Sequence, residues 1–419
     1  MNIEFYRRTV IRLCSQPRTF EFISKNSAGL DPIQVTEILK ELKHEGKILK
    51  KDSMWVLPDD KKPLTLAFQD KDPQNYLKKY MGHFEYLKMP HPLDFEWRNS
   101  KHSLNYLTDQ MLKLSVPNDN ILVLGMPTLF ANICERDVTQ SVTLVERNKP
   151  IVNGLKKFVN HKAKIHDADI FKIAPEKLGR YQCVFMDPPW YSEHFYQFVW
   201  LAARCLETGG TLAISIPPIN TRPDIDIERL AWFQFCQQQG LCLENLYANH
   251  LEYTMPFFEF NAFRAGGIQN ILPFWRKGDF AVFKKMKDHH TERKEYEEKV
   301  SGWLEREVDT VRIRIKITEN EENTEFSIRN LVKGDILPTV SSRDKRRVEA
   351  NVWTSGNRIF KVSNPTLFLS CIDRLNGSST GDATMNDVKR FLDMITDLEK
   401  NEYNNYLEWV YYEMERQIT

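Results

Sequence analysis

Long apolar runs are absent from this sequence, and none approaches the roughly 20 residues that a membrane-spanning helix needs. An excess of one charge is also absent, because 58 basic residues balance 57 acidic residues to a formal net charge of +1. Charge therefore argues neither for nor against a nucleic-acid partner, and any basic surface has to be local. The opening residues, MNIEFYRRTV, contain no apolar signal-peptide core, so we expect a cytoplasmic protein.

Cysteine pairs and glycine-rich phosphate loops are missing as well. The seven cysteines form no CxxC pair, which argues against a zinc site or a disulfide framework, and we expect no metal. Without a GxGxxG motif an NAD site is not expected, and without GxxxxGK[ST] a P-loop is not expected.

The most informative stretch is Tyr181–Tyr191, which reads YQCVFMDPPWY. Its apolar run predicts a strand buried on both faces, as in a parallel sheet. Pro188 and Pro189 end that strand, because proline has no N–H to donate. Asp187 and Trp190 are thereby brought to the carboxyl edge of a sheet, where open α/β folds bind ligands.

Residues 1–60 are predicted to form a winged-helix-like domain. Asp31 and Pro32 start its third helix as N-cap and first helical residue, and a basic hairpin follows. The outward face mixes acids with bases. A duplex-binding arm and a docking or dimerisation module therefore both remain open.

Residues 61–115 contain several prolines and are predicted to be a linker with a helical lead-in. Within it, Phe95–Arg98 could line a cofactor pocket or simply pack. Residues 300–419 are predicted to be an added C-terminal α+β domain, with a basic period-two strand at Thr310–Ile317. We find no catalytic motif there.

Residues 116–288 alternate strand-like and helix-like segments, which is typical of an α/β domain. One predicted helix, Phe195–Leu206, should end at the glycines that follow Thr208. A long loop or broken helix is expected over Met255–Gly267.

Three predicted strand ends carry candidate cofactor residues. Gly125, followed by Met126 and Pro127, allows close approach of the backbone to a ligand. Glu146 could accept hydrogen bonds from both ribose hydroxyls, and Asp167, next to Ala168, could accept one from the amine of adenine. This layout suits an adenosine-bearing cofactor without a pyrophosphate.

Leu124–Phe130 together with Asp187-Pro188-Pro189-Trp190 resembles the class I S-adenosylmethionine-dependent methyltransferases, and more narrowly the N6-adenine-methyltransferase-like family. The resemblance covers about residues 93–285. It implies a Rossmann-like core with a mostly parallel seven-stranded sheet, S-adenosyl-L-methionine as cofactor and methylation of an amine. This family includes an rRNA adenine methyltransferase with zinc knuckles, which this sequence lacks, and a lysine methyltransferase.

The motif suits a weakly nucleophilic amine such as N6 of adenine in DNA or RNA. Asp187 and the Pro188 carbonyl could each accept one N6–H hydrogen bond, while Trp190 stacks on a flipped-out base. Pro188-Pro189 keeps that carbonyl stiff. Asp187 could instead cap the next helix, and Trp190 could belong to the core.

Weaker substrate candidates are Tyr191, Phe257 and Phe258. A lysine methyltransferase would need an acidic and aromatic channel, which Glu193 and Glu259 could form with the two phenylalanines. Branched-chain polyamine synthases, which are aminopropyltransferases, also resemble a winged helix followed by an Asp-Pro-Pro fold. They carry an acidic Gly-Asp-Asp-Asp stretch where this chain has Gly125–Thr128. A non-catalytic binding protein is the remaining alternative, and oligomeric state and target cannot be predicted.

Overall fold

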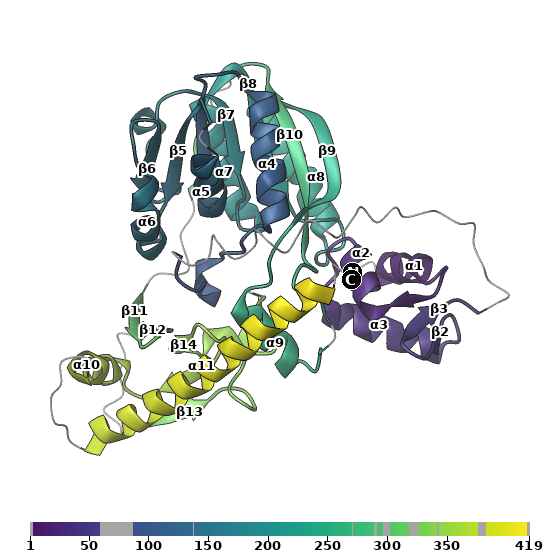
Figure 1. Ribbon diagram of the computed structural model, residues 1–419, viewed down its shortest axis with the longest axis vertical. Helices are drawn as coiled ribbons and strands as arrows, with labels where there is room; N and C mark the ends of the chain where they lie inside the picture. The colour runs from purple at the N-terminus through teal and green to yellow at the C-terminus, as the bar shows by residue number, and fades with distance from the viewer. Residues whose placement is uncertain are drawn as a thin grey trace.

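The structure is a computed structural model that describes residues 3–58, 87–136, 138–269, 271–288, 291–295, 302–317, 326–341, 343–375 and 383–416. Three parts of the chain are visible in Figure 1: a large sheet domain, an N-terminal helical unit beside it, and a C-terminal sheet crossed by a long helix. Among the described residues, no helix combines the length and the hydropathy that a membrane span requires.

The predicted mostly parallel seven-stranded sheet is confirmed. Its order is β6-β5-β4-β7-β8-β10-β9, in which β4, β5, β6, β7 and β8 run parallel and β10 is antiparallel to both of its neighbours. The strands are β4 (Asn120–Leu124), β5 (Ser141–Glu146), β6 (Ala163–Asp167), β7 (Tyr181–Met186), β8 (Leu206–Ile216), β9 (Leu241–Glu252) and β10 (Lys277–Lys285).

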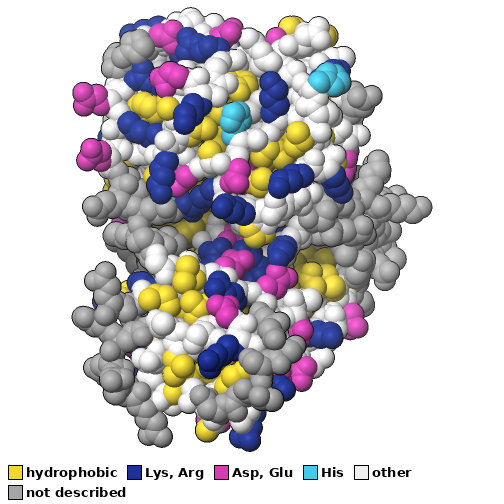
Figure 2. Space-filling view, turned by 90° about the vertical axis from the view of Figure 1, so that its left-hand side faces the viewer, with side chains coloured by type: hydrophobic (Ala, Val, Ile, Leu, Met, Phe, Trp, Pro, Cys, Tyr) yellow, Lys and Arg dark blue, Asp and Glu magenta, His cyan; other side chains and the backbone are white. Residues whose placement is uncertain are grey.

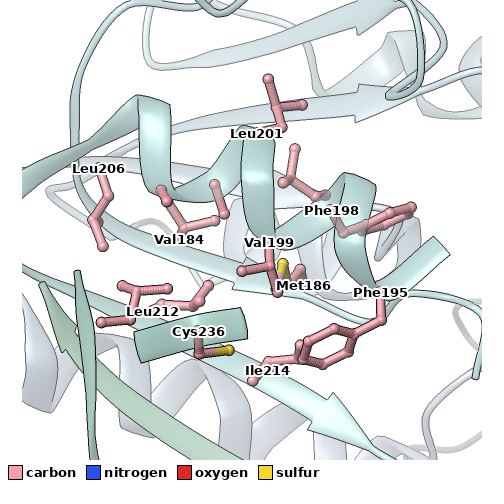
Figure 3. Packing of buried hydrophobic residues seen from close by; sticks show 14 of the residues in the cluster. Val184, Met186, Phe195, Phe198, Val199, Leu201, Leu206, Leu212, Ile214 and Cys236 are labelled. Carbon is pink, nitrogen blue, oxygen red and sulfur yellow. The ribbon is translucent and has the colours of Figure 1, made fainter. Parts of the chain in front are cut away.

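Helices cover both faces of this sheet (Figure 1). They are α4 (Lys101–Leu114), α5 (Pro127–Glu135), α6 (Lys149–Leu155), α7 (Ser192–Cys205) and α8 (Ile225–Gln238). Alternation along β7 explains the two layers: Val184 and Met186 pack with α7 and α8, whereas Cys183 and Phe185 pack with α4 and α5. Figure 3 shows Val184 and Met186 beside Val199 of α7.

The predicted glycine end of the helix at Phe195–Leu206 is wrong. α7 ends at Cys205, and the chain enters β8 at once, where Leu206 pairs with Tyr181. A Cβ on Gly210 would lie 2.8 Å from the Gln182 carbonyl oxygen. Gly210 is therefore needed for close strand pairing and not for a helix cap.

The N-terminal unit contains α1 (Ile3–Leu13), α2 (Phe20–Asn26) and α3 (Pro32–His44), with a sheet of order β1-β3-β2. Its strands are β1 (Arg18–Thr19), β2 (Leu49–Lys51) and β3 (Met54–Val56). Asp31 caps α3 by accepting a 2.8 Å hydrogen bond from the N–H of Ile33.

The C-terminal part is a five-stranded sheet of order β11-β12-β14-β15-β13 with two helices. Its elements are β11 (Trp303–Val308), β12 (Val311–Lys316), β13 (Ile328–Asn330), β14 (Val352–Thr354), β15 (Ile359–Val362), α10 (Pro365–Leu375) and α11 (Ala383–Arg416). Helix α11 also packs on α9 (Phe257–Ala265) of the sheet domain, where Tyr406 donates a 2.7 Å hydrogen bond to the carbonyl of Met255.

The basic face of β12 binds the segment that precedes the sheet domain. Arg312 is buried, and its guanidinium contacts the Asp94 carboxylate at 2.5 Å and the Glu305 carboxylate at 2.9 Å. Arg314 pairs with the same two carboxylates. Although burial raises it, the two arginines hold the pKa of Asp94 well below its ordinary value. This network fixes the short helix η3 (Pro92–Asp94) and the residues after it.

Candidate active site

Asp187 lies directly after β7, next to the end of β4, where its N–H donates to the Leu124 carbonyl at 3.4 Å. These two central strands lie where the strand order changes direction, between β5 on one side and β8 on the other. Ligands of open α/β sheets bind at that point. Two cavities meet there, and they share a wall made of Phe95, Glu96, Gly125, Pro127, Asp187 and Pro189.

Asp187 is held by Tyr253, which no sequence motif marks. The Tyr253 hydroxyl donates a 2.8 Å hydrogen bond to Asp187 Oδ2 and also contacts the Ser215 hydroxyl. Burial raises the pKa of Asp187 to about 7, while hydrogen bonds from Tyr253, Ser215 and Trp190 favour its charged form. Burial and Asp187 raise the pKa of Tyr253 well above its ordinary value, so this phenol stays a donor.

The Glu146 cavity has a volume of about 600 Å³ and lies over the ends of β4, β5 and β6. Glu146 Oε1 accepts a 2.8 Å hydrogen bond from the N–H of Asn148. Burial raises the pKa of Glu146 to about 7. A buried carboxylate at the second strand end is the acceptor that a ribose diol needs, so this residue fits the predicted cofactor.

Gly125 forms the floor between the two cavities. Its φ is +65°, and a Cβ there would lie 3.1 Å from Cε1 of Phe198. Glycine is therefore needed both for the backbone conformation and for the space above it. Met126 lines only the other cavity, which is the one that Trp190 lines, whereas Pro127 lines both.

Ala168 lines the Glu146 cavity, but Asp167 is exposed and lines neither cavity. Asp169 lines it instead, and its Oδ1 accepts a 2.9 Å hydrogen bond from the N–H of Phe171. The predicted strand end is thus placed correctly, while the carboxylate facing the cavity comes two residues later. Beyond β6 the chain leaves the two-residue alternation of a strand, so sequence spacing could not distinguish the two acids.

Glu96 supplies a second carboxylate to both cavities. Its side chain is 10% exposed, and Oε1 pairs with Arg98 Nε at 2.7 Å. Oε2 is buried and has no hydrogen-bond partner among the residues that the structure describes. Burial raises the pKa of Glu96. A raised pKa is expected for a buried carboxylate when one of its oxygens receives no hydrogen bond. Of Phe95–Arg98, expected either to line a cofactor pocket or to pack, only Phe95 and Glu96 line the Glu146 cavity; Trp97 and Arg98 line the other cavity alone.

The Trp190 cavity, about 480 Å³ in volume, lies on the other side of the shared wall. Asp187, Pro188, Pro189, Trp190 and Tyr191 all line it. All three parts of the chain contribute to its walls: Gly29, Asp31, Ile33 and Gln34 come from the N-terminal unit, Thr221 to Pro223 from the loop after β8, and residues between 339 and 346 from the C-terminal part.

Arg276 contacts three tryptophan rings that line this cavity. The Arg276 guanidinium lies 5.1 Å from the Trp97 ring centroid, 5.8 Å from Trp190 and 4.7 Å from Trp275. It also pairs with Glu259, whose side chain is fully buried. These contacts fix the Trp190 ring from one side, and Tyr253 meets it edge-on at 5.6 Å.

Phe257 and Phe258, predicted to bind substrate, line neither cavity. Both are almost fully buried, at 1% and 0% exposure. Phe257 packs on Tyr403 and Tyr406 of α11, and Phe258 packs edge-on against Trp97. The expected loop or broken helix is the helix α9, which places the Phe257 ring in the interface with α11 and the Phe258 ring against Trp97.

The N-terminal unit is docked on the sheet domain. The Asn220 N–H donates a 2.9 Å hydrogen bond to the Ala28 carbonyl, and its side-chain amide donates one of 2.8 Å to the Ser27 carbonyl. Gly29 has φ +85°, and a Cβ there would lie 2.6 Å from Thr221 Oγ1. These contacts favour the docking interpretation of this unit for the edge that faces the Trp190 cavity.

Comparisons with known proteins agree with this geometry. Residues 97–263 match the family described as "Probable N6-adenine methyltransferase". No curated protein sequence matches the chain. Two solved structures of the branched-chain polyamine synthase from Thermus thermophilus, one of them the C9 mutein, have a similar fold, with TM-scores of 0.56 for the mutein and 0.52 for the other.

The mutein is 11% identical over 69% of this chain and 88% of its own, and the other structure is 13% identical over 69% and 89%. Both are complexes with N4-aminopropylspermidine and 5'-methylthioadenosine. A putative RNA methyltransferase from Pyrococcus horikoshii is 16% identical over 51% of this chain and 94% of its own, with a TM-score of 0.34. The sheet domain of this chain has the fold of these solved structures, and its segment 97–263 resembles the N6-adenine methyltransferase family.

Proposed function

We propose that the protein methylates N6 of adenine in DNA or RNA. The observation that carries this proposal is the position of the Asp187-Pro188-Pro189-Trp190 motif: all four residues line the Trp190 cavity, and Asp187 and Pro189 also belong to the wall that it shares with the Glu146 cavity. The Glu146 cavity holds the cofactor, and in the Trp190 cavity the motif faces the acceptor. S-adenosylmethionine supplies a methyl group on a sulfonium.

The residues of the Glu146 cavity hold the adenosine part of the cofactor. Glu146 accepts hydrogen bonds from the ribose hydroxyls, while Ala168 and Asp169 flank the adenine ring. Gly125 lets the backbone approach closely. Glu96, through its unpartnered Oε2 at the shared wall, accepts from the ammonium of the methionine part.

The residues of the Trp190 cavity hold and orient the acceptor. The Asp187 carboxylate and the Pro188 carbonyl accept the two N6–H hydrogens, which draws the amine nitrogen out of conjugation with the ring. Pro189 has no N–H to compete for that carbonyl. The Tyr253 hydroxyl fixes the Asp187 carboxylate at 2.8 Å, and the Trp190 ring stacks on the base.

The charges of the cavity favour a nucleic-acid acceptor over a polycation or a lysine. Five arginines line the Trp190 cavity, against four carboxylates, and the acidic channel considered for lysine is not assembled there. Glu259 is buried in its pair with Arg276, and Glu193 is exposed on α7 and lines neither cavity. A polyamine or lysine ammonium would have to compete with these arginines for the carboxylates with which they pair.

The test offers tritiated S-adenosylmethionine with single-stranded DNA, single-stranded RNA, cell protein or spermidine. We expect label in nucleic acid and N6-methyladenine after hydrolysis to nucleosides. Asp187→Asn should lower turnover about 100-fold or more and leave S-adenosylhomocysteine binding intact. Asp109→Asn, at an exposed carboxylate of α4, is the matched control and should behave as wild type. Label confined to protein or spermidine would refute the adenine assignment.

A further inference from the structure

Residues 339–341 and 343–347 form the outer rim of the Trp190 cavity. Thr339, Val340, Ser341, Arg343, Asp344 and Arg346 line it from the C-terminal part of the chain. Four of the last five residues of this segment are basic, namely Arg343, Lys345, Arg346 and Arg347, and only Asp344 is acidic. In a chain whose formal net charge is only +1, this is a local concentration of positive charge.

The rim is anchored on the C-terminal sheet and not left as a free loop. Asp344 Oδ1 caps the helix η6 (Lys345–Val348) by accepting a 2.9 Å hydrogen bond from the N–H of Arg346. Arg347 donates to the Val340 carbonyl at 3.0 Å and lies 4.4 Å from the ring centroid of Trp353 in β14. The positions of Arg343, Lys345 and Arg346 are therefore set by the fold, while their side chains stay exposed.

The sheet domain supplies a facing cation. Arg222, after β8, and Arg343 both pair with Glu228, at 2.5 Å and 3.1 Å. They also lie 5.6 Å and 6.0 Å from the ring centroid of Tyr191, which follows the Asp-Pro-Pro-Trp motif. Two guanidinium groups around one carboxylate keep a net positive charge, and this charge sits at the mouth of the acceptor cavity.

The pKa of Arg347 also indicates that the rim would gain from an anion. Burial lowers its pKa to about 10, and the attraction of Tyr191 and Asp344 does not compensate. A guanidinium in that state gains from a nearby anion. Figure 2 gives a space-filling view in which Lys and Arg side chains, interspersed with Asp and Glu, lie along the hollow across the middle of the molecule.

We propose that Arg343, Lys345 and Arg346, with Arg222 opposite, bind the phosphodiester groups that flank the nucleotide whose base enters the Trp190 cavity. The acceptor is then a polynucleotide strand and not a free nucleoside. This inference rests on the proposed function and adds a role for the C-terminal part, in which no catalytic motif was found. Phosphate contacts position the strand without reading its sequence.

The test measures binding by fluorescence anisotropy with labelled 12-nucleotide single strands, in parallel DNA and RNA arms, over a series of salt concentrations. The triple variant Arg343→Ala, Lys345→Ala, Arg346→Ala should bind about tenfold more weakly, and its plot of log affinity against log salt should be shallower by about 2. The matched control, Lys389→Ala, Arg390→Ala, Lys400→Ala, removes three exposed cations of α11 that line neither cavity. It should bind as wild type.

Two further measurements separate this proposal from the proposed function. Calorimetry with S-adenosylhomocysteine should give equal affinities for the triple variant and wild type, which shows an intact fold. An unchanged salt slope and an unchanged KM for the oligonucleotide in the triple variant would overturn the phosphate rim, even if adenine is methylated. Conversely, rim-dependent binding without any methylated adenine would leave the rim standing and refute the function.

Discussion

The Tyr253 hydroxyl donates a 2.8 Å hydrogen bond to Asp187 Oδ2. Because Tyr253 directly follows the edge strand β9, this bond joins the end of β9 to the motif after β7. Gly278 makes room for it, because a Cβ there would lie 2.9 Å from Ser215 Oγ and 3.0 Å from Tyr253 Cε2. The bond favours the charged form of a carboxylate whose pKa burial raises to about 7. A neighbour from a distant part of the chain therefore favours the ionised form of the proposed N6–H acceptor, against the effect of burial.

Removing that donor should lower activity through the pKa of Asp187. In Tyr253→Phe the charged form loses a hydrogen bond, so the pKa rises further and less of the carboxylate is ionised at pH 7. We expect kcat near neutral pH to fall about tenfold, and the rising limb of the kcat profile to move to higher pH. Tyr247→Phe, at an exposed position on β9, is the control. A profile that keeps its wild-type midpoint would contradict the role given to Tyr253.

Glu146 should make both stability and cofactor binding depend on pH. Its pKa is about 7 in the native protein against an ordinary value of 4.5, so the native state holds a proton that the unfolded chain has released between these values. The stabilising contribution is therefore complete below about pH 4.5 and is lost as the pH rises through about 7. The free energy of unfolding, from urea titrations, should fall less across this window in Glu146→Gln than in wild type.

The same proton should oppose ligand binding. Because the ribose hydroxyls need the ionised carboxylate, wild-type affinity for S-adenosylhomocysteine should rise from about pH 6 to about pH 8. In Glu146→Gln, calorimetry should show weaker binding with a flatter pH dependence. A variant that binds as tightly as wild type at pH 8 would remove Glu146 from the cofactor site.

Glu96→Gln should weaken binding of the amino-acid part of the cofactor without affecting binding of its adenosine part. If Glu96 accepts from the methionine ammonium, S-adenosylhomocysteine should bind about tenfold more weakly, since a charge-assisted hydrogen bond is lost. Binding of 5'-methylthioadenosine, which has no amino-acid part, should be unchanged. Glu135→Gln, at a partly exposed carboxylate of α5, serves as control. Equal losses for both ligands would instead indicate a structural role through the pair with Arg98.

Gly125→Ala has a matched control in Gly179→Ala. Both glycines have positive φ, +65° and +87°, so each alanine costs about 1–2 kcal/mol of stability. Only at Gly125 would the new Cβ meet a neighbour, Phe198 at 3.1 Å, and only Gly125 lines a cavity. We expect similar shifts in thermal unfolding but loss of S-adenosylhomocysteine binding in Gly125→Ala alone. Comparable binding by the two variants would place the cofactor elsewhere.

The sheet domain could be predicted because its signals are local. Unbroken apolar runs such as Cys183–Met186 give buried parallel strands, and the residues that follow them reach one edge whatever the rest of the chain does. This is why Gly125, Glu146 and Asp187 lie around one pair of cavities at the strand ends. Asp167 lies outside both cavities where the strand ends and alternation stops, and Phe257 lies outside them where α11 covers α9.

By itself, the sequence determined the order of strands and helices in the sheet domain and the motif that stands at its edge. Only the tertiary structure decided which distant groups surround that motif. Tyr253, Glu96, Arg276 and the rim at 339–341 and 343–347 have no common spacing, because they come from loops and edges that meet through packing between separate parts of the chain. Local spacing fixes where a side chain leaves a strand, whereas long-range packing fixes what it meets.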